Sequence, residues 1–273
     1  MDLNFKHIVH REHLGTRLVE IFDTKESRSL YFGGKYLQSQ LLHNNPERLA
    51  LIYTRYMVSS LLLIPNLRRV LVIGVGAGSL VHFLHHHFPQ CHIDCVDHSE
   101  RIIEIAQDFF HLQASEQIAI HCCDGREFLT LSPSPLPYDL ILVDAFDEEG
   151  MAPAIYDASF FKLCSAQLHR HGVASFNIWH NKKSAISRVI RQLQNHFPHG
   201  YLLPIPYRDN VIAHMRHSPV PWPRLLLEKE QARRLQQEYR IEFRAIGRLA
   251  IRHNMSLARR ISWYLERTLK PYS

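Results

Sequence analysis

Short, strongly apolar runs alternate along the middle of this chain with longer segments in which apolar residues recur at helical spacing. The first run, residues 70–73, consists of four aliphatic residues, as is typical of a parallel strand covered on both faces. A helical pattern follows at 78–88, and strand and helix patterns continue to alternate as far as residue 197. This order predicts an open α/β sheet of mostly parallel strands with helices on both faces.

The further strands of this sheet are expected at 92–97, 118–124, 138–144 and 172–179, and further helices at 99–110, 157–168 and 182–197. Two more apolar runs, 201–206 and 210–215, are separated only by Tyr207-Arg208-Asp209. This spacing predicts an antiparallel hairpin that closes the sheet. The pattern therefore predicts a Rossmann-like sheet of seven strands.

The N-terminal part has a different pattern. Residues 16–22 and 28–32 are rich in strand-forming residues, and Gly33-Gly34 follows them as a hairpin signal. A small antiparallel sheet is therefore expected before the main domain. Asn45-Pro46 has the form of a helix start, with Asn as N-cap, and Pro65-Asn66 would end that helix.

The C-terminal part reads as a helical extension. Pro219, Pro221 and Pro223 predict a stiff connection, and residues 224–268 predict one or two basic helices with a break at Gly247. The chain is thus predicted to have three parts: an N-terminal β-hairpin and helix domain at 1–66, a Rossmann-like domain at 67–217 and a helical extension at 218–273.

Charge distinguishes the extension from the rest. The whole chain has a net charge of +6. Residues 224–273 hold 12 Lys and Arg against 5 Asp and Glu, so the basic character lies in this segment. A basic helical tail can contact RNA, an acidic lipid surface or another protein, but it is more often a solvated helix face, so nucleic acid is not the expected partner. The sequence has no apolar run of about 18 residues and no N-terminal signal core, and we expect a cytoplasmic protein without membrane contact.

Metal and disulfide chemistry are not indicated. The five cysteines are odd in number, form no C-x-x-C pair and lie partly in expected strands, which favours reduced core thiols. The run of three histidines at 85–87 resembles a metal tract, but consecutive residues of a helix point in different directions. No metal is therefore expected.

Glycines and acids gather at one edge of the predicted sheet. Gly74, Gly76 and Gly78 follow the first strand and would let the backbone approach a ligand closely. Asp97, Asp124-Gly125 and Asp144 end the next three strands. Asp97 lies where an acid binds ribose hydroxyls, and a carboxylate with a glycine backbone at 124–125 suits an adenine edge.

This arrangement favours one class of nucleoside. No Lys-Ser or Lys-Thr follows the glycines, so the turn is not a phosphate-binding P-loop. An adenosyl-sulfonium compound carries no phosphate and one positive charge, which suits three nearby carboxylates. The sequence therefore predicts an adenosyl-sulfonium site at the carboxyl ends of the strands.

Several motifs between residues 16 and 217 resemble those of one family, the spermidine/spermine synthases (polyamine aminopropyltransferases). The motifs are Gly74-Val75-Gly76-Ala77-Gly78-Ser79, Val96-Asp97, Cys123-Asp124-Gly125 and the segment 138–147, with Gln38 after the hairpin and Tyr53 on the following helix. The resemblance implies the class I S-adenosylmethionine-dependent methyltransferase fold.

The resemblance also implies a reaction. A primary amine attacks the methylene beside the sulfonium of decarboxylated S-adenosylmethionine and accepts its aminopropyl group. On the matching positions, Asp144 takes the proton of the amine, Asp147 holds the diamine and Tyr53 lines the amine site. The donor would be bound by Gln38, Gly74, Gly76, Ala77, Gly78, Asp97, Asp124, Gly125 and Asp144. A homo-oligomer, such as a dimer, is also implied.

Two positions depart from the family's pattern. The family has an aspartate at the position of Ala77, which holds the ammonium of the decarboxylated donor, so the resemblance leaves open whether this chain prefers that donor or intact S-adenosylmethionine. The family has His-Glu or Gln-Glu where this chain has Thr54-Arg55. An Arg55 that faces the cleft would disfavour a polyamine, whereas an Arg55 that faces away would have no effect.

Three hypotheses follow. The first is an aminopropyltransferase of polyamine biosynthesis that acts on a small amine. The second is a methyltransferase that uses intact S-adenosylmethionine as its co-substrate. The third is a non-catalytic binding protein that keeps this fold and uses its tail to bind a partner.

Overall fold

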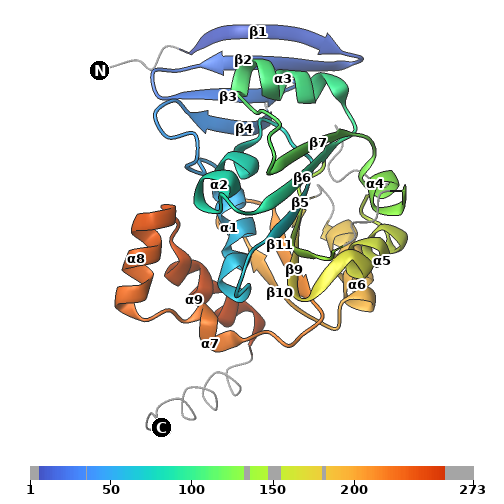
Figure 1. The fold of residues 1–273 in the computed structure, drawn as a ribbon, viewed down its shortest axis with the longest axis vertical. Coiled ribbons are helices and arrows are strands. Elements are labelled where there is room, and N and C mark those ends of the chain that lie inside the picture. The colour runs from blue at the N-terminus through green and yellow to red at the C-terminus, as the bar shows by residue number, and fades with distance from the viewer. Residues whose placement is uncertain (1–5, 35, 132–135, 147–154, 180–182, 256–273) are drawn as a thin grey trace, which may run out of the picture.

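The computed structural model describes residues 6–34, 36–131, 136–146, 155–179 and 183–255. Its larger sheet has seven strands in the order β10-β11-β9-β8-β5-β6-β7 (Figure 1). The strands are β5 (Arg69–Ile73), β6 (His92–Asp97), β7 (Ile118–Cys122), β8 (Tyr138–Val143), β9 (Leu168–Ile178), β10 (His199–Pro204) and β11 (Val211–Arg216). Strand β11 runs antiparallel to both of its neighbours, β10 and β9, and the other strand pairs of this sheet are parallel. The predicted seven-stranded, mostly parallel sheet with a closing hairpin is confirmed.

The helices of the main domain cover both faces of this sheet. They are α2 (Ser79–His87), α3 (Glu100–Phe110), α4 (Gly125–Leu131), α5 (Ala158–Gln167) and α6 (Lys183–His196). Helices α4, α5 and α6 share one apolar cluster with the sheet, and α2 belongs to a second cluster on the opposite face. Ser99 and Asp157 cap α3 and α5, since each side chain accepts a backbone N–H from the first helical turn.

The N-terminal sheet has four antiparallel strands, β1 (His7–Leu14), β2 (Arg17–Asp23), β3 (Ser27–Phe32) and β4 (Tyr36–Leu42). The hairpin between β3 and β4 turns through Gly33 and Gly34, whose φ angles are +57° and +69°. The sequence prediction missed β1, because residues 10–13 are four consecutive polar residues and none of the residues of this strand is buried.

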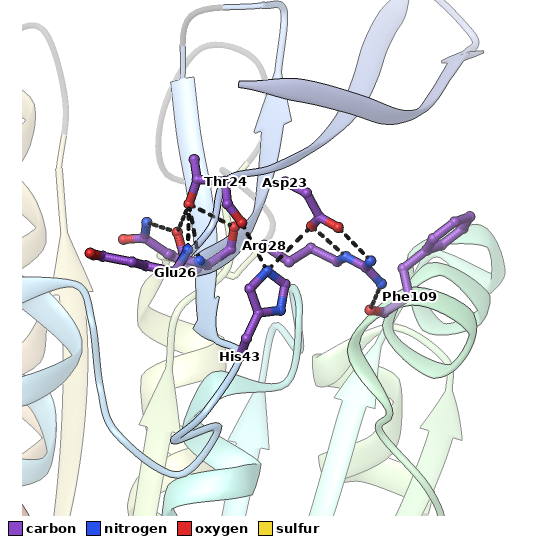
Figure 2. Close-up of polar contacts among 8 residues, drawn as sticks. Asp23, Thr24, Glu26, Arg28, His43 and Phe109 are labelled. Atoms are coloured by element: carbon purple, nitrogen blue, oxygen red, sulfur yellow. Dashed lines mark hydrogen bonds and ion pairs between the residues drawn. The ribbon is translucent and has the colours of Figure 1, made fainter. Parts of the chain in front are cut away.

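Arg28 of β3 anchors this small sheet to the main domain through the Phe109 carbonyl, and its bidentate ion pair with Asp23 of β2 lies within the small sheet (Figure 2). The Arg28 guanidinium donates to both carboxylate oxygens of Asp23 at 2.7 Å and to the Phe109 carbonyl at 2.8 Å. The Phe109 carbonyl lies in the last turn of α3, where helix carbonyls lack an intrahelical partner. The hydrogen bonds from Arg28 lower the pKa of Asp23. Figure 2 also shows His43 on the other side of the same carboxylate.

The helix expected from Asn45 is shorter than predicted. Helix α1 covers Ile52–Val58 and continues as a 3-10 helix, η1, over Ser59–Leu63. Asn45 instead forms a bridge with Leu42, and its carbonyl accepts the N–H of Arg48. The Asn-Pro pair is therefore used in a turn that leads out of β4, and the prediction that a helix begins there was wrong.

The described part of the C-terminal extension, up to residue 255, belongs to the core rather than forming a solvated tail. Its described helices are α7 (Trp222–Leu225), α8 (Lys229–Tyr239) and α9 (Phe243–Asn254). Leu225, Phe243 and Ile246 are at most 3% exposed and belong to the same apolar cluster as Val70 and Val72 of β5. A truncation before residue 219 would therefore expose part of the main core, although the domain boundaries themselves stay predictions.

The histidine tract and the cysteines have structural surroundings. The His87 ring lies 4.7 Å from that of Tyr239 in α8, and the described residues contain no group of three or more potential metal ligands. Cys91, Cys95 and Cys164 are buried free thiols, but Cys122 is exposed, against the expectation of a buried strand. Within the described part of the chain, no helix has the length and apolarity needed to span a membrane.

Gly247 is a packing site and not the break that the sequence suggested, because α9 runs through it without interruption. A Cβ at this position would lie 1.9 Å from the Leu225 carbonyl oxygen of α7. Gly247→Ala gains about 1 kcal/mol of helix propensity but must push two backbones apart. We expect a net loss of about 1–3 kcal/mol in the free energy of unfolding, measured by urea denaturation. Ala245→Gly, at an exposed site on the same helix, is the control and should cost only the propensity.

Candidate active site

The glycine turn is built against the end of strand β8. Gly74 has φ +87°, and its N–H donates to the Val96 carbonyl at 2.9 Å. A Cβ on Gly74 would lie 2.3 Å from the carbonyl oxygen of Asp144. Only glycine fits this position, so the turn and the Asp144 backbone are held in contact. Gly76 and Gly78 also have positive φ angles, and α2 begins at Ser79 immediately after them.

Strand β4 closes the turn from the side of the N-terminal sheet. The hydroxyls of Ser39 and Ser79 are 3.0 Å apart in a buried contact, and Ser79 also donates to the Gln40 carbonyl at 3.2 Å. These bonds place Gln38, the predicted donor-binding residue of β4, beside the turn. Because Arg28 holds the small sheet on the main domain, its contact with Phe109 also helps to keep Gln38 at the site.

The two acids expected to bind the nucleoside have backbone partners. The Asp97 carboxylate accepts the N–H groups of Val75 at 2.9 Å and Ser99 at 3.0 Å, and thus ties the glycine turn to the end of β6. Asp124 accepts the N–H of Arg126 at 2.8 Å at the start of α4. Each carboxylate has further lone pairs, so the ribose and adenine roles stay predictions.

Gly125 completes this part of the site. A Cβ there would lie 2.8 Å from the Ile73 side chain, so glycine allows α4 to begin close to the end of β5. The structure therefore brings Asp97, Asp124 and Gly125 to the same sheet edge as the glycine turn, as predicted from their positions at strand ends.

Asp144 lies at the carboxyl end of β8 and is partly buried. Burial raises the pKa of its carboxyl to about 6, while hydrogen bonding from Asn177 opposes that rise. Asn177 Nδ2 donates to Asp144 Oδ1 at 2.8 Å. A carboxylate with a pKa near neutrality that is still mostly ionised at pH 7 is suited to accept a proton.

Tyr53 joins Asp144 to strand β4. Its hydroxyl donates to the Gln38 carbonyl at 2.9 Å, and burial together with the charge of Asp144 raises the pKa of the Tyr53 phenol well above 10. The phenol therefore stays protonated, and it gives its one proton to the Gln38 carbonyl. The structure thus brings together Gln38, Tyr53 and Asp144 from three separate elements, and Asp147 lies outside the described residues.

The two departures from the family pattern have clear positions. Ala77 is 0% exposed, and its methyl group belongs to an apolar cluster between the N-terminal sheet and α3. Arg55 donates to the Glu242 carboxylate at 2.8 Å, in the extension, so it pairs with an acid there. The alternative in which Arg55 disfavours a polyamine by facing the cleft is therefore not supported.

Two asparagines of the site were missed in the sequence. Asn177 is 2% exposed and lies near the end of β9, and Asn210 precedes β11 and donates to Asn177 at 2.9 Å. The available signal was a lone amide in the largely apolar run of 172–179. A buried amide in a strand needs hydrogen-bond partners, and the nearest strand end carries Asp144.

The comparison with known protein families agrees with this geometry. The sequence model described as the spermine/spermidine synthase domain matches residues 50–218, which is more than half of the chain. This chain belongs to the spermine/spermidine synthase family. It is a transferase with the class I methyltransferase fold, as the resemblance implied.

Two kinds of relative are found. A polyamine aminopropyltransferase of Chromobacterium violaceum is 30% identical over 82% of this chain and 86% of its own length. The mouse eEF1A lysine and N-terminal methyltransferase is 30% identical over 55% of this chain, which spans 23% of that larger protein.

Solved structures divide in the same way. A probable spermidine synthase from Corynebacterium glutamicum has a TM-score of 0.69 at 16% identity over 86% of each chain, which supports the fold. Human methyltransferase-like protein 13, solved in complex with SAH, has a TM-score of 0.63 at 26% identity over 70% of this chain and 93% of its own.

Proposed function

We propose that this protein transfers an aminopropyl group from decarboxylated S-adenosylmethionine to a small amine, as a step of polyamine biosynthesis. The observation that carries the proposal is the partly buried Asp144 carboxylate, which lies against the glycine turn and beside Tyr53. An amine attacks a carbon centre only as the free base. A carboxylate with a pKa of about 6 can take the proton that the amine loses.

The rest of the site supports an adenosyl donor. Asp97 and Asp124 with Gly125 lie on the strands beyond the glycine turn, in the order in which ribose and adenine would be met. Gln38, Gly74, Gly76, Ala77 and Gly78 would line the remainder of the donor site, and Asp147 would hold the far end of the amine. Charge neutralisation and the alignment of two reactants would supply most of the rate enhancement.

The direct test is a product assay. The protein is mixed with decarboxylated S-adenosylmethionine and either putrescine or spermidine, and methylthioadenosine is measured by chromatography. We expect methylthioadenosine in equimolar amount with a longer polyamine, and none without the amine. The absence of product with every common amine would contradict the proposal.

Methyl transfer from intact S-adenosylmethionine is the second candidate, and Ala77 favours it. An alanine at this place neither attracts the ammonium of the decarboxylated donor nor repels the carboxylate of the intact one. The two candidates can be distinguished by which reaction product stabilises the protein more. If the protein is a methyltransferase, S-adenosylhomocysteine should raise the melting temperature more than methylthioadenosine does. If it transfers aminopropyl groups, methylthioadenosine should raise it more. A dimer and a cytoplasmic location stay predictions of the sequence.

A further inference from the structure

A buried chain of amides leads from Asp144 to the hairpin that closes the sheet. Asn177 Nδ2 donates to Asp144 Oδ1 at 2.8 Å, and Asn177 Oδ1 accepts from Asn210 Nδ2 at 2.9 Å. The Asn177 backbone carbonyl accepts the Tyr156 hydroxyl at 2.7 Å. The side-chain amide of Asn177 is therefore held at both its nitrogen and its oxygen, in a strand whose other buried residues are apolar or small.

The direction of these bonds matters for the carboxylate. An Asn side chain turned by 180° would present its oxygen to Asp144, and two acceptors would face each other. The Asn210 donor opposes this rotation, because it requires an acceptor at the far end of the Asn177 amide. Asn210 is in turn fixed by the hairpin, since its carbonyl accepts the N–H of Ile205 at 3.1 Å.

We propose that Asn177 and Asn210 are positioning residues that fix the orientation of the Asp144 carboxylate and couple it to the β10–β11 hairpin. The inference rests on the proposed role of Asp144 as the base. It assigns no contact with the substrate to either asparagine. Asn210 lies in the loop between β10 and β11, so the orientation of the Asn177 amide depends on the placement of that loop.

Among the described residues, the titratable and charged groups that face Asp144 are few. Tyr53 comes from α1 and Tyr156 from the segment before α5, and both phenols have a pKa raised by burial. The positive charge of Arg208 opposes the rise in the pKa of Tyr53. Because none of these groups changes its charge between pH 5 and 8, a shift of the Asp144 titration in a variant at 177 or 210 reports the amide contact.

The test uses the full chain with Asn177→Leu and Asn210→Ala, and Ser175→Ala as control. Ser175 lies on the same strand, is fully buried and donates to the Met57 carbonyl at 3.3 Å. The titration of Asp144 is followed by NMR of ¹³C-carboxyl-labelled aspartate, with the signal assigned by its loss in Asp144→Asn. This measurement needs no substrate.

We expect the Asp144 midpoint to rise by about one pH unit in Asn177→Leu, by less in Asn210→Ala and not at all in Ser175→Ala. The acid limb of kcat/KM for aminopropyl transfer should move by the same amounts, and kcat above that limb should fall about tenfold with a small change in the KM of the donor. Equal midpoints in Asn177→Leu and Ser175→Ala would overturn the inference.

The two proposals fail in different ways. A shifted NMR midpoint in a protein without aminopropyl transfer would contradict the proposed function and leave the positioning role in place. Activity with an unshifted midpoint would contradict the positioning role alone. If Asn177→Leu does not fold, the half-buried Asn210→Ala provides the same comparison, because it leaves the Asn177 amide present but free to rotate.

Discussion

Asp144→Asn should slow transfer by about 10²–10⁴-fold and, at the same time, stabilise the folded protein. Asparagine keeps the size of the side chain and can still accept from Asn177, but it cannot take a proton from the amine. General base catalysis contributes about 10²–10⁴-fold, and we expect kcat to fall by that factor. The measurement is methylthioadenosine formation under saturating donor and amine at pH 8.

The gain in stability follows from the raised pKa of Asp144. Its carboxyl titrates at about 6 in the folded protein but near 4 in the unfolded chain, so ionisation opposes folding. This penalty is absent below about pH 4, grows between about pH 4 and pH 6, and is complete above about pH 6. Two pKa units correspond to at most about 3 kcal/mol, and partial solvent exposure reduces this figure. Unfolding by urea at pH 4.5 and pH 8 should show a difference between variant and wild type that grows with pH.

Asp139→Asn is the matched control at the opposite end of β8. Asp139 accepts the backbone N–H groups of Arg68 and Arg69 at 2.9 and 3.1 Å, away from the glycine turn. It should leave kcat within about twofold of the wild type. An Asp144→Asn variant that keeps more than a tenth of the activity would show that another group accepts the proton.

The main sheet could be predicted because each of its strands is a short apolar run in the sequence. The four aliphatic residues at 70–73 could only be a buried strand, and Asp97 and Asp144 follow directly from the strand ends. Parallel strands place their carboxyl ends at one edge, so the sequence was sufficient to bring these acids together. The strand order agrees with the fold that the family resemblance implied.

Long-range contacts account for what the sequence did not predict. Asn45 was expected to cap a helix, but its pairing with Leu42 depends on where β4 ends. Gly247 looked like a helix break, yet its role is the close approach of Leu225 from another helix. The partner of Arg55 is Glu242, 187 residues away, and no local pattern joins the two.

Ala77→Asp should strongly destabilise the folded protein. The Ala77 methyl is fully buried and lies in a cluster with Ile21, Leu30 and Ile105, which offers no partner for a carboxylate. An uncompensated buried charge costs about 3–5 kcal/mol. Burial raises the pKa of such an acid, so the loss should be greatest at pH 8 and should shrink as the pH falls and the aspartate becomes protonated. Urea denaturation at both pH values measures it.

Ala77→Asn separates charge from size, because its side chain has the same shape and no charge. The difference between the two variants at pH 8 is the cost of the charge. If this position lies beside the end of the donor, the ammonium of decarboxylated S-adenosylmethionine should recover that cost and stabilise Ala77→Asp more than Ala77→Asn, whereas intact S-adenosylmethionine should stabilise it less. Equal stabilisation of the two variants by the two donors would show that residue 77 does not face the donor and that its alanine leaves the choice of donor to other residues.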